Sequence, residues 1–182
     1  MKIKRILAGV CAFALLASSV LSLGSCSTGK KDKYVVGISQ LVTHPALDAA
    51  TEGFKKALIE KLGEDKVEFV YQNAANQPDV CATIANGFVS SKVDLIMANG
   101  TAALQAAANA TLDIPILGTS ITEYGVALEI DNFTGTVGGN VSGTSDLAPL
   151  DEQAQMIIDL VPEAKTVGLL YCSAEPNSAY QV

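Results

Sequence analysis

The sequence contains no tryptophan, a single histidine and few aromatic residues, which make up 5% of its 182 residues. Its 12 Lys and Arg are outnumbered by 19 Asp and Glu, and positive charge is in local excess only near the amino terminus. Because proteins that bind nucleic acids neutralise phosphates with clustered Lys and Arg, the net charge of −7 argues against a nucleic-acid partner. An acidic body suits small neutral or zwitterionic ligands better than polyanions.

Cysteine is also scarce, and its four positions have different surroundings. Cys11 lies in an apolar amino-terminal run and Cys26 follows it, while Cys81 lies in an expected helix and Cys172 after an expected strand. We expect no disulfide between Cys81 and Cys172, because the expected order of strands and helices places the two residues far apart. No group of residues has the spacing of a metal site, so the sequence predicts neither a metal nor another cofactor.

Residues 1–25 have the features of a lipoprotein signal peptide. Three basic residues precede an apolar run over residues 6–23, and Leu23-Gly24-Ser25-Cys26 ends it in small residues. This tetrapeptide resembles a bacterial lipobox, in which the cysteine is lipidated and becomes the new amino terminus. An ordinary secretory signal and an uncleaved anchor are the alternatives, and all three place the body outside the cytoplasm. Residues 26–33 are polar and basic and are expected to be a tether.

The rest of the chain alternates short apolar runs with amphipathic stretches, which predicts an α/β fold. Strands are expected at 34–39, 66–72, 93–98, 114–117 and 166–171, with weaker candidates at 126–130 and 135–137. Helices are expected from Pro45, from Pro78, over 102–110 and over 149–161, the last with Leu150, Ala154, Ile157, Ile158 and Val161 inward. The stretch 138–146 is expected to be a loop or hinge, and Asn177 or Ser178 to cap a further helix. Strand, helix, strand order requires a right-handed crossover and a parallel sheet.

Small polar residues follow the central strands, at Asn99-Gly100-Thr101 and at Gly118-Thr119-Ser120. In parallel sheets ligands bind outside the carboxyl ends of the strands, so we expect a ligand site built from these loops. Thr101 lies at a helix amino terminus, which favours an anionic group such as a carboxylate, although capping is the commoner role of a threonine hydroxyl in that place. His44 also lies at a helix start, where contact with a ligand and capping are both open. The first loop, 40–44, has no glycine-rich turn, which argues against a dinucleotide site.

Motifs that follow the strands carry a family resemblance. They are His44-Pro45-Ala46-Leu47-Asp48, Asn73, Gly100-Thr101-Ala102-Ala103, Thr119-Ser120, Gly139-Asn140-Val141-Ser142-Gly143-Thr144-Ser145-Asp146, Pro162-Glu163-Ala164-Lys165 and Glu175-Pro176-Asn177-Ser178. In this order they resemble the extracytoplasmic substrate-binding lipoproteins of ABC importers, in the branch associated with tryptophan and tyrosine uptake. The resemblance covers nearly all of residues 34–178.

The resemblance implies a type I periplasmic-binding fold, in which two α/β lobes close on a ligand. A Rossmann-like lobe with a parallel sheet would span 34–146, and 147–182 would begin a second, truncated lobe, so that the sequence resembles an amino-terminal fragment. The implied ligand-binding residues are Gln40, His44, Thr101, Ala102, Thr119 and Ser120 from the first lobe and Glu175 and Asn177 from the second. Two departures bear on the ligand: Ala102 replaces a common proline, and Ile121-Thr122-Glu123-Tyr124 replaces the usual Val-Thr-Asp-Pro run.

The implied function is capture of a small amino acid, of the aromatic class, outside the membrane and its delivery to an ABC permease. Without tryptophan, ring stacking has to come from Tyr124, Phe133 or further chain. A sugar or nucleoside binder and the receptor lobe of a sensor are alternatives. A surface hydrolase with Ser120, His44 and Asp146 as a triad is a rival from another class, but no Gly-x-Ser-x-Gly elbow supports it.

Overall fold

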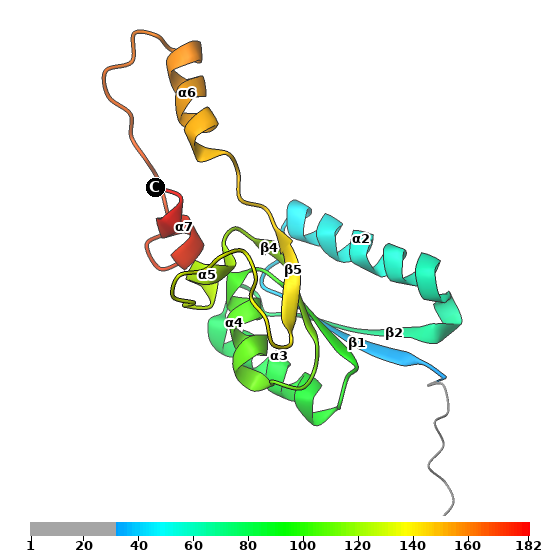
Figure 1. Cartoon of the computed structure of the whole chain (residues 1–182). Coiled ribbons are helices and arrows are strands. Elements are labelled where there is room, and N and C mark those ends of the chain that lie inside the picture. The colour runs from blue at the N-terminus through cyan, green and yellow to red at the C-terminus, as the bar shows by residue number, and fades with distance from the viewer. Residues whose placement is uncertain (1–31) are drawn as a thin grey trace, which may run out of the picture. The chain divides into compact units, whose positions relative to one another are not determined.

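The computed structural model describes residues 32–182, so the predicted signal peptide and the predicted lipidation site Cys26 lie outside the described residues. A parallel sheet of five strands, in the order β2-β1-β3-β4-β5, forms the centre of the described part (Figure 1). Its strands are β1 (Tyr34–Gln40), β2 (Val67–Asn73), β3 (Leu95–Asn99), β4 (Ile116–Ile121) and β5 (Val141–Ser145). The predicted α/β class with a parallel sheet is confirmed.

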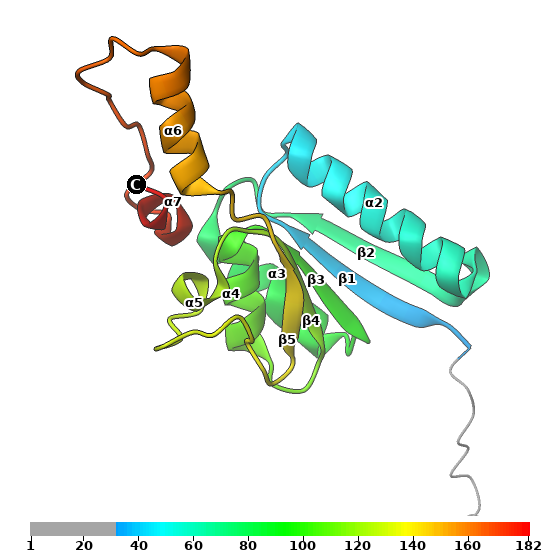
Figure 2. The ribbon, with the colours of Figure 1, turned by 45° about the horizontal axis from the view of Figure 1, so that its top comes forward.

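The helices cover the two faces of the sheet unequally. They are α2 (Pro45–Leu62), the short 3-10 helix η1 (Glu64–Lys66), α3 (Pro78–Ser90), α4 (Thr101–Ala110), α5 (Tyr124–Ala127), α6 (Leu150–Leu160) and α7 (Pro176–Tyr180). Helix α2 covers one face alone, while α3 and α4 pack together on the other (Figure 2). Among residues 32–182, no helix combines the length and the apolar character needed to cross a membrane.

The hydrophobic core is divided by the sheet into two clusters. The larger lies under α3 and α4, where Phe88, Ile96 and Leu104 are fully buried. Phe88 packs so closely on β1 that a Cβ atom at Gly37 would lie 2.7 Å from its ring, which explains a glycine inside a strand. The smaller cluster lies under α2 and includes Ile38 and Met97. Side chains of successive strand residues alternate between the two clusters because strands have a period of two.

Four predictions between residues 117 and 146 were wrong. Thr119 and Ser120 do not follow β4 but belong to it, because β4 is paired with β3 and β5 on both sides. The expected loop 138–146 contains strand β5, whose polar residues are tolerated because it is an exposed edge strand. The weak strand candidate at 126–130 overlaps helix α5, and the one at 135–137 is not a strand.

The carboxyl-terminal stretch also differs from its prediction. Helix α6 lies within the predicted range, but none of its residues is buried, so its predicted inward face is wrong. Residues 166–171 were predicted to be a buried strand; they form none, and Leu170 is fully exposed. A strand requires a neighbour for its backbone hydrogen bonds, and the described part of the chain provides none for this segment.

Candidate functional site

The carboxyl ends of β1, β3 and β4 bring the predicted polar residues to one edge of the sheet. Gln40 lies opposite Asn99 in the parallel register, and Asn99 lies opposite Thr119. Ser120 follows Thr119 in β4, and Thr101 begins α4 two residues after Asn99. The predicted residues therefore lie at one edge of the sheet, while the convergence of their side chains on one ligand stays a prediction.

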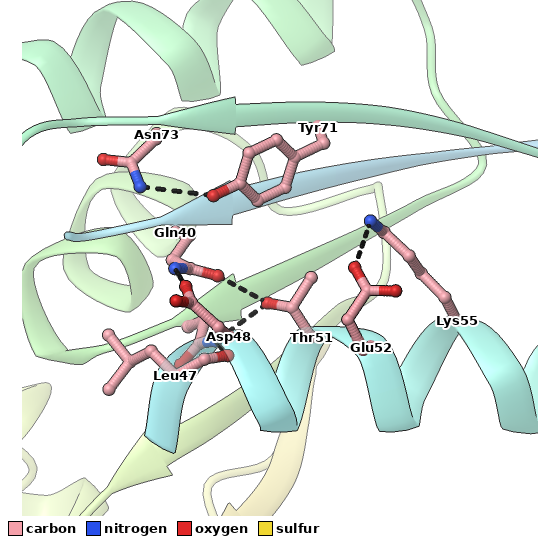
Figure 3. A network of polar contacts seen from close by, with 9 residues as sticks. Gln40, Leu47, Asp48, Thr51, Glu52, Lys55, Tyr71 and Asn73 are labelled. Carbon is pink, nitrogen blue, oxygen red and sulfur yellow. Dashed lines mark hydrogen bonds and ion pairs between the residues drawn. The ribbon is translucent and has the colours of Figure 1, made fainter. Parts of the chain in front are cut away.

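Gln40 is completely buried and is held by a polar network rather than open to solvent (Figure 3). Its Nε2 donates to the Val42 carbonyl at 2.9 Å and to Asp48 Oδ1 at 2.6 Å, and its Oε1 accepts a hydrogen bond from Thr51 Oγ1 at 2.7 Å. With these bonds the amide has a partner for both of its polar atoms. In this structure Gln40 joins the end of β1 to the first two turns of α2.

Asn99 extends the same network from β3. Its Nδ2 donates to the Leu47 carbonyl at 2.8 Å and to Thr51 Oγ1 at 3.0 Å, while its Oδ1 is buried without a partner. Buried amides that are paired in this way fix the geometry around them. Gln40, Asn99 and Thr51 thus set the position of α2 relative to the edge. The parts played by Asn99 and Thr51 were not predicted, and only the place of Asn99 at a strand end signalled it.

His44 caps α2. Its backbone is extended, and its Nδ1 accepts a hydrogen bond from the Ala46 amide at 3.2 Å. Pro45 follows at the first helical position, where its missing N–H has no cost. Of the two roles left open for His44, capping is the one that this structure shows.

The amino terminus of α4 has no side-chain cap. Gly100 precedes it with a φ of 105°, and a Cβ atom there would lie 3.0 Å from the Leu41 side chain, so only glycine fits. Thr101 is buried and Ala102 is half-buried. The first N–H groups of a helix have no partner within it, and together with the helix dipole they favour an anion. The start of α4 therefore has features that favour an anionic group.

The end of β4 is joined to the residue before α4 by its backbone, because the Thr119 carbonyl accepts a hydrogen bond from the Gly100 amide at 3.0 Å. Thr119 Oγ1 lies 3.1 Å from Thr144 Oγ1 of β5. Ser120 has a φ of 56°, a left-handed conformation that is uncommon for residues other than glycine, and the pairing of β4 with β5 is irregular there. Bulges of this kind redirect side chains and are frequent beside binding sites. No sequence signal indicated this conformation.

Tyr124 and Phe133, the two predicted sources of aromatic contact, line one cavity. It has a volume of about 550 Å³ and is bordered by α5, β5 and the loop between them. The Tyr124 hydroxyl donates to the Thr144 carbonyl at 3.2 Å, and burial, with the negative charge of Asp146 adding to it, raises the pKa of Tyr124 to about 12. A second cavity, of about 350 Å³, lies between α2 and the β4–β5 pair and has Thr119 in its wall.

The two predicted residues of the carboxyl-terminal segment lie at α7. Glu175, not Asn177 or Ser178, caps this helix by accepting a hydrogen bond from the Ser178 amide, and its Oε1 is buried without a partner. Asn177 is buried; its Nδ2 donates to Thr101 Oγ1 at 3.4 Å and its Oδ1 accepts from the Glu123 amide at 3.1 Å. The structure therefore joins Asn177 to Thr101, across 76 residues of sequence.

The residues of the rival hydrolase triad are not brought together. Ser120, His44 and Asp146 are not joined by any hydrogen bond in the described structure, and the His44 ring is engaged in capping. Residues 32–182 contain no group of three His, Cys, Asp or Glu side chains able to hold a metal. Cys81 is buried and Cys172 is exposed, and both are free thiols, as the sequence predicted.

Comparisons with known proteins show which family of proteins the chain resembles. A family model described as ABC transporter substrate binding protein matches residues 35–182. A protein named "Tyrosine-binding protein" from Clostridioides difficile (strain R20291) is 41% identical over 188 residues, covering 97% of this chain and 53% of that protein. The chain thus spans about half the length of this relative.

Two solved structures are similar in both fold and sequence. One is an ABC domain from Streptococcus pneumonia in complex with L-Trp, with a TM-score of 0.76 and 34% identity over 82% of this chain and 50% of that one. The other is the ligand-free, open structure of CD0873, a substrate binding protein with adhesive properties from Clostridium difficile. It has a TM-score of 0.65 and 42% identity over 81% of this chain and 50% of that one.

Proposed function

Because the chain belongs to the family of ABC transporter substrate-binding proteins, we propose that it binds an aromatic amino acid and delivers it to an ABC permease. The name of the tyrosine-binding relative and the L-Trp in the similar structure support this class of ligand. The observation that carries the proposal is the uncapped amino terminus of α4, which begins at Thr101 and is joined to β4 by the hydrogen bond from the Gly100 amide to the Thr119 carbonyl.

Each part of an amino acid has a candidate partner in this arrangement. The carboxylate meets the free amide groups of α4 and the hydroxyls of Thr119 and Ser120. The ammonium group meets Glu175, whose buried Oε1 has no other partner. The ring enters the cavity lined by Tyr124 and Phe133, whose volume of about 550 Å³ lies in the range of small-molecule pockets.

Gln40, His44 and Ala102 contribute to the site by holding or supplying backbone groups, not through contacts of their side chains with the ligand. Gln40 and His44 fix the loop 41–44 and the start of α2, and Ala102 contributes the second amide of α4. Ligand contact then involves the backbone of α4 and the hydroxyls of β4 more than the Gln40 amide.

The proposal includes an extracytoplasmic location and a lipid anchor. We infer a signal peptide at 1–25, lipidation at Cys26, a tether over 26–33, a first lobe over 34–146 and the beginning of a second over 147–182. Metabolic labelling with palmitate in a bacterial host tests the anchor: the label is expected in the full chain and absent from Cys26→Ser. Equal labelling of both would contradict lipidation at this residue.

Titration of the full chain, followed by the ¹⁵N amide resonances, tests the site. L-tryptophan and L-tyrosine are expected to shift the amides of Thr101 and Ala102. Tryptamine, which has the same ring and ammonium group but no carboxylate, is expected to leave those two amides unchanged. Indole-3-propionate, which lacks the ammonium group, is expected to shift them while binding more weakly, because it has nothing to pair with Glu175.

Matched variants separate a wrong site from a wrong function. Thr101→Val removes the hydroxyl at nearly constant volume and is expected to weaken binding, whereas Thr83→Val, exposed on α3, is expected to leave it unchanged. If L-tryptophan shifts amide resonances elsewhere in the chain but not those of Thr101 and Ala102, this site is wrong. If only sugars or nucleosides shift any resonance, the amino-acid function is wrong.

A further inference from the structure

The segment 147–182 touches the body of the structure through little buried surface. Helix α6 contains no buried residue, and the stretch from 161 to 174 is exposed throughout. Asn177 is the single buried residue of this segment, with 2% of its surface exposed. The residue that anchors α7 is therefore polar, in contrast to the apolar anchors that hold most helices to a protein body.

Both polar atoms of the Asn177 side-chain amide have hydrogen-bond partners in the body of the structure. Its Oδ1 accepts from the Glu123 amide at 3.1 Å, and its Nδ2 donates to Thr101 Oγ1 at 3.4 Å. Gln181, one turn further on, donates from Nε2 to Thr122 Oγ1 at 3.3 Å. Burial of an amide without such partners costs free energy, so Asn177 is stable in this buried position only because Thr101 and Glu123 pair with it.

We propose that Asn177 is a clasp that holds α7 over the amino terminus of α4 through Thr101 and Glu123, and that a carboxylate ligand at α4 tightens it. The ligand-dependent part of this inference rests on the proposed function. The role differs from direct ligand contact, because the clasp joins two parts of the protein and exists without a ligand.

The Thr101 hydroxyl provides the link between clasp and ligand. A hydroxyl has one hydrogen to donate and two lone pairs to accept with. When it accepts from Asn177 Nδ2, its own hydrogen is free to point to a ligand carboxylate beside the α4 terminus. A carboxylate that takes this hydrogen orients the lone pairs towards Asn177, so ligand and clasp stabilise each other.

Amide hydrogen exchange on the ligand-free full chain tests the clasp by itself. In Asn177→Ala the Glu123 amide loses its acceptor, and its exchange is expected to accelerate about tenfold, as the loss of one hydrogen bond predicts. Asn86→Ala, which removes an exposed asparagine on α3, is the matched control and is expected to leave Glu123 unchanged. Unchanged exchange at Glu123 in Asn177→Ala would overturn the clasp, whether or not any amino acid binds.

A second variant tests the link with the ligand. Asn177→Asp keeps an acceptor for the Glu123 amide but obliges the Thr101 hydroxyl to donate to it, and it adds negative charge near the ligand carboxylate. The Glu123 amide is expected to stay protected, while L-tryptophan binds at least about tenfold more weakly and tryptamine does not bind more weakly. An equal loss for both compounds, or no loss for L-tryptophan, would refute the coupling through Thr101 and leave the proposed function to its own titration.

Discussion

The buried network at the start of α2 makes a quantitative prediction for Thr51→Val. The Thr51 hydroxyl donates to Gln40 Oε1 at 2.7 Å and accepts from Asn99 Nδ2 at 3.0 Å, and all three side chains are buried. Valine has nearly the same shape, so no cavity forms and the change isolates the hydrogen bonds. Asn99 Nδ2 keeps its bond to the Leu47 carbonyl, but Gln40 Oε1 is left buried without a partner.

The magnitude follows from these losses. Each buried hydrogen bond contributes about 1 kcal/mol net, and an unsatisfied buried acceptor costs about 1–3 kcal/mol, so Thr51→Val is expected to lower the free energy of unfolding by about 2–4 kcal/mol. Urea unfolding of the full chain, followed by circular dichroism, measures the change as a lower midpoint with an unchanged slope. The control Thr83→Val is expected to stay within about 0.5 kcal/mol, because that hydroxyl is exposed.

A double-mutant cycle shows whether the network is the cause. Gln40→Leu alone removes the partner of Thr51 and of Asp48, and it is expected to be destabilising as well. Combined with Thr51→Val it removes both ends of one bond, so the double variant is expected to lose less than the sum of the two single losses. A loss below about 0.5 kcal/mol for Thr51→Val, or strict additivity, would refute the reasoning.

Three further predictions concern other parts of the structure. The pKa of Tyr124, raised from 10.0 to about 12, means that the folded state holds this proton more tightly, so its contribution to stability is complete below pH 10 and lost as the pH rises towards 12. Tyr124→Phe is expected to lack this part of the alkaline decline in urea midpoints, and identical declines would contradict it. Native alkylation with peptide mapping is expected to label Cys172 and to spare Cys81 until the chain unfolds; early labelling of Cys81 would show that α3 is not packed as described. The exposed apolar side chains of α6 and of residues 166–171 are expected to cause self-association, which Leu170→Lys reduces in sedimentation experiments; a single monomeric species for the unaltered chain would contradict this.

Sequence patterns alone predicted the elements that depend on local signals. Pro45 and Pro78 marked the starts of α2 and α3 because a proline suits the first turn of a helix. Apolar runs marked β1, β3 and β4, since strands in the middle of a parallel sheet are covered on both faces and contain few polar residues. The crossover order of a parallel sheet then predicts that the strand ends lie at one edge, and this prediction places Thr101, Thr119 and Ser120 there.

Tertiary structure decided the features in which local preference is weak or distant groups take part. Residues 141–145 have a loop-like composition and became a strand because β4 offered an unpaired edge, while 166–171 have a strand-like composition and remained unpaired because no edge was near. Hydrogen bonds with Asp48 and Thr51 of α2 made Gln40 a buried support. Contacts with Thr101 and Glu123 made Asn177 an anchor. Such roles depend on partners far away in the chain, and a linear pattern carries no information about which partner a polar group will meet.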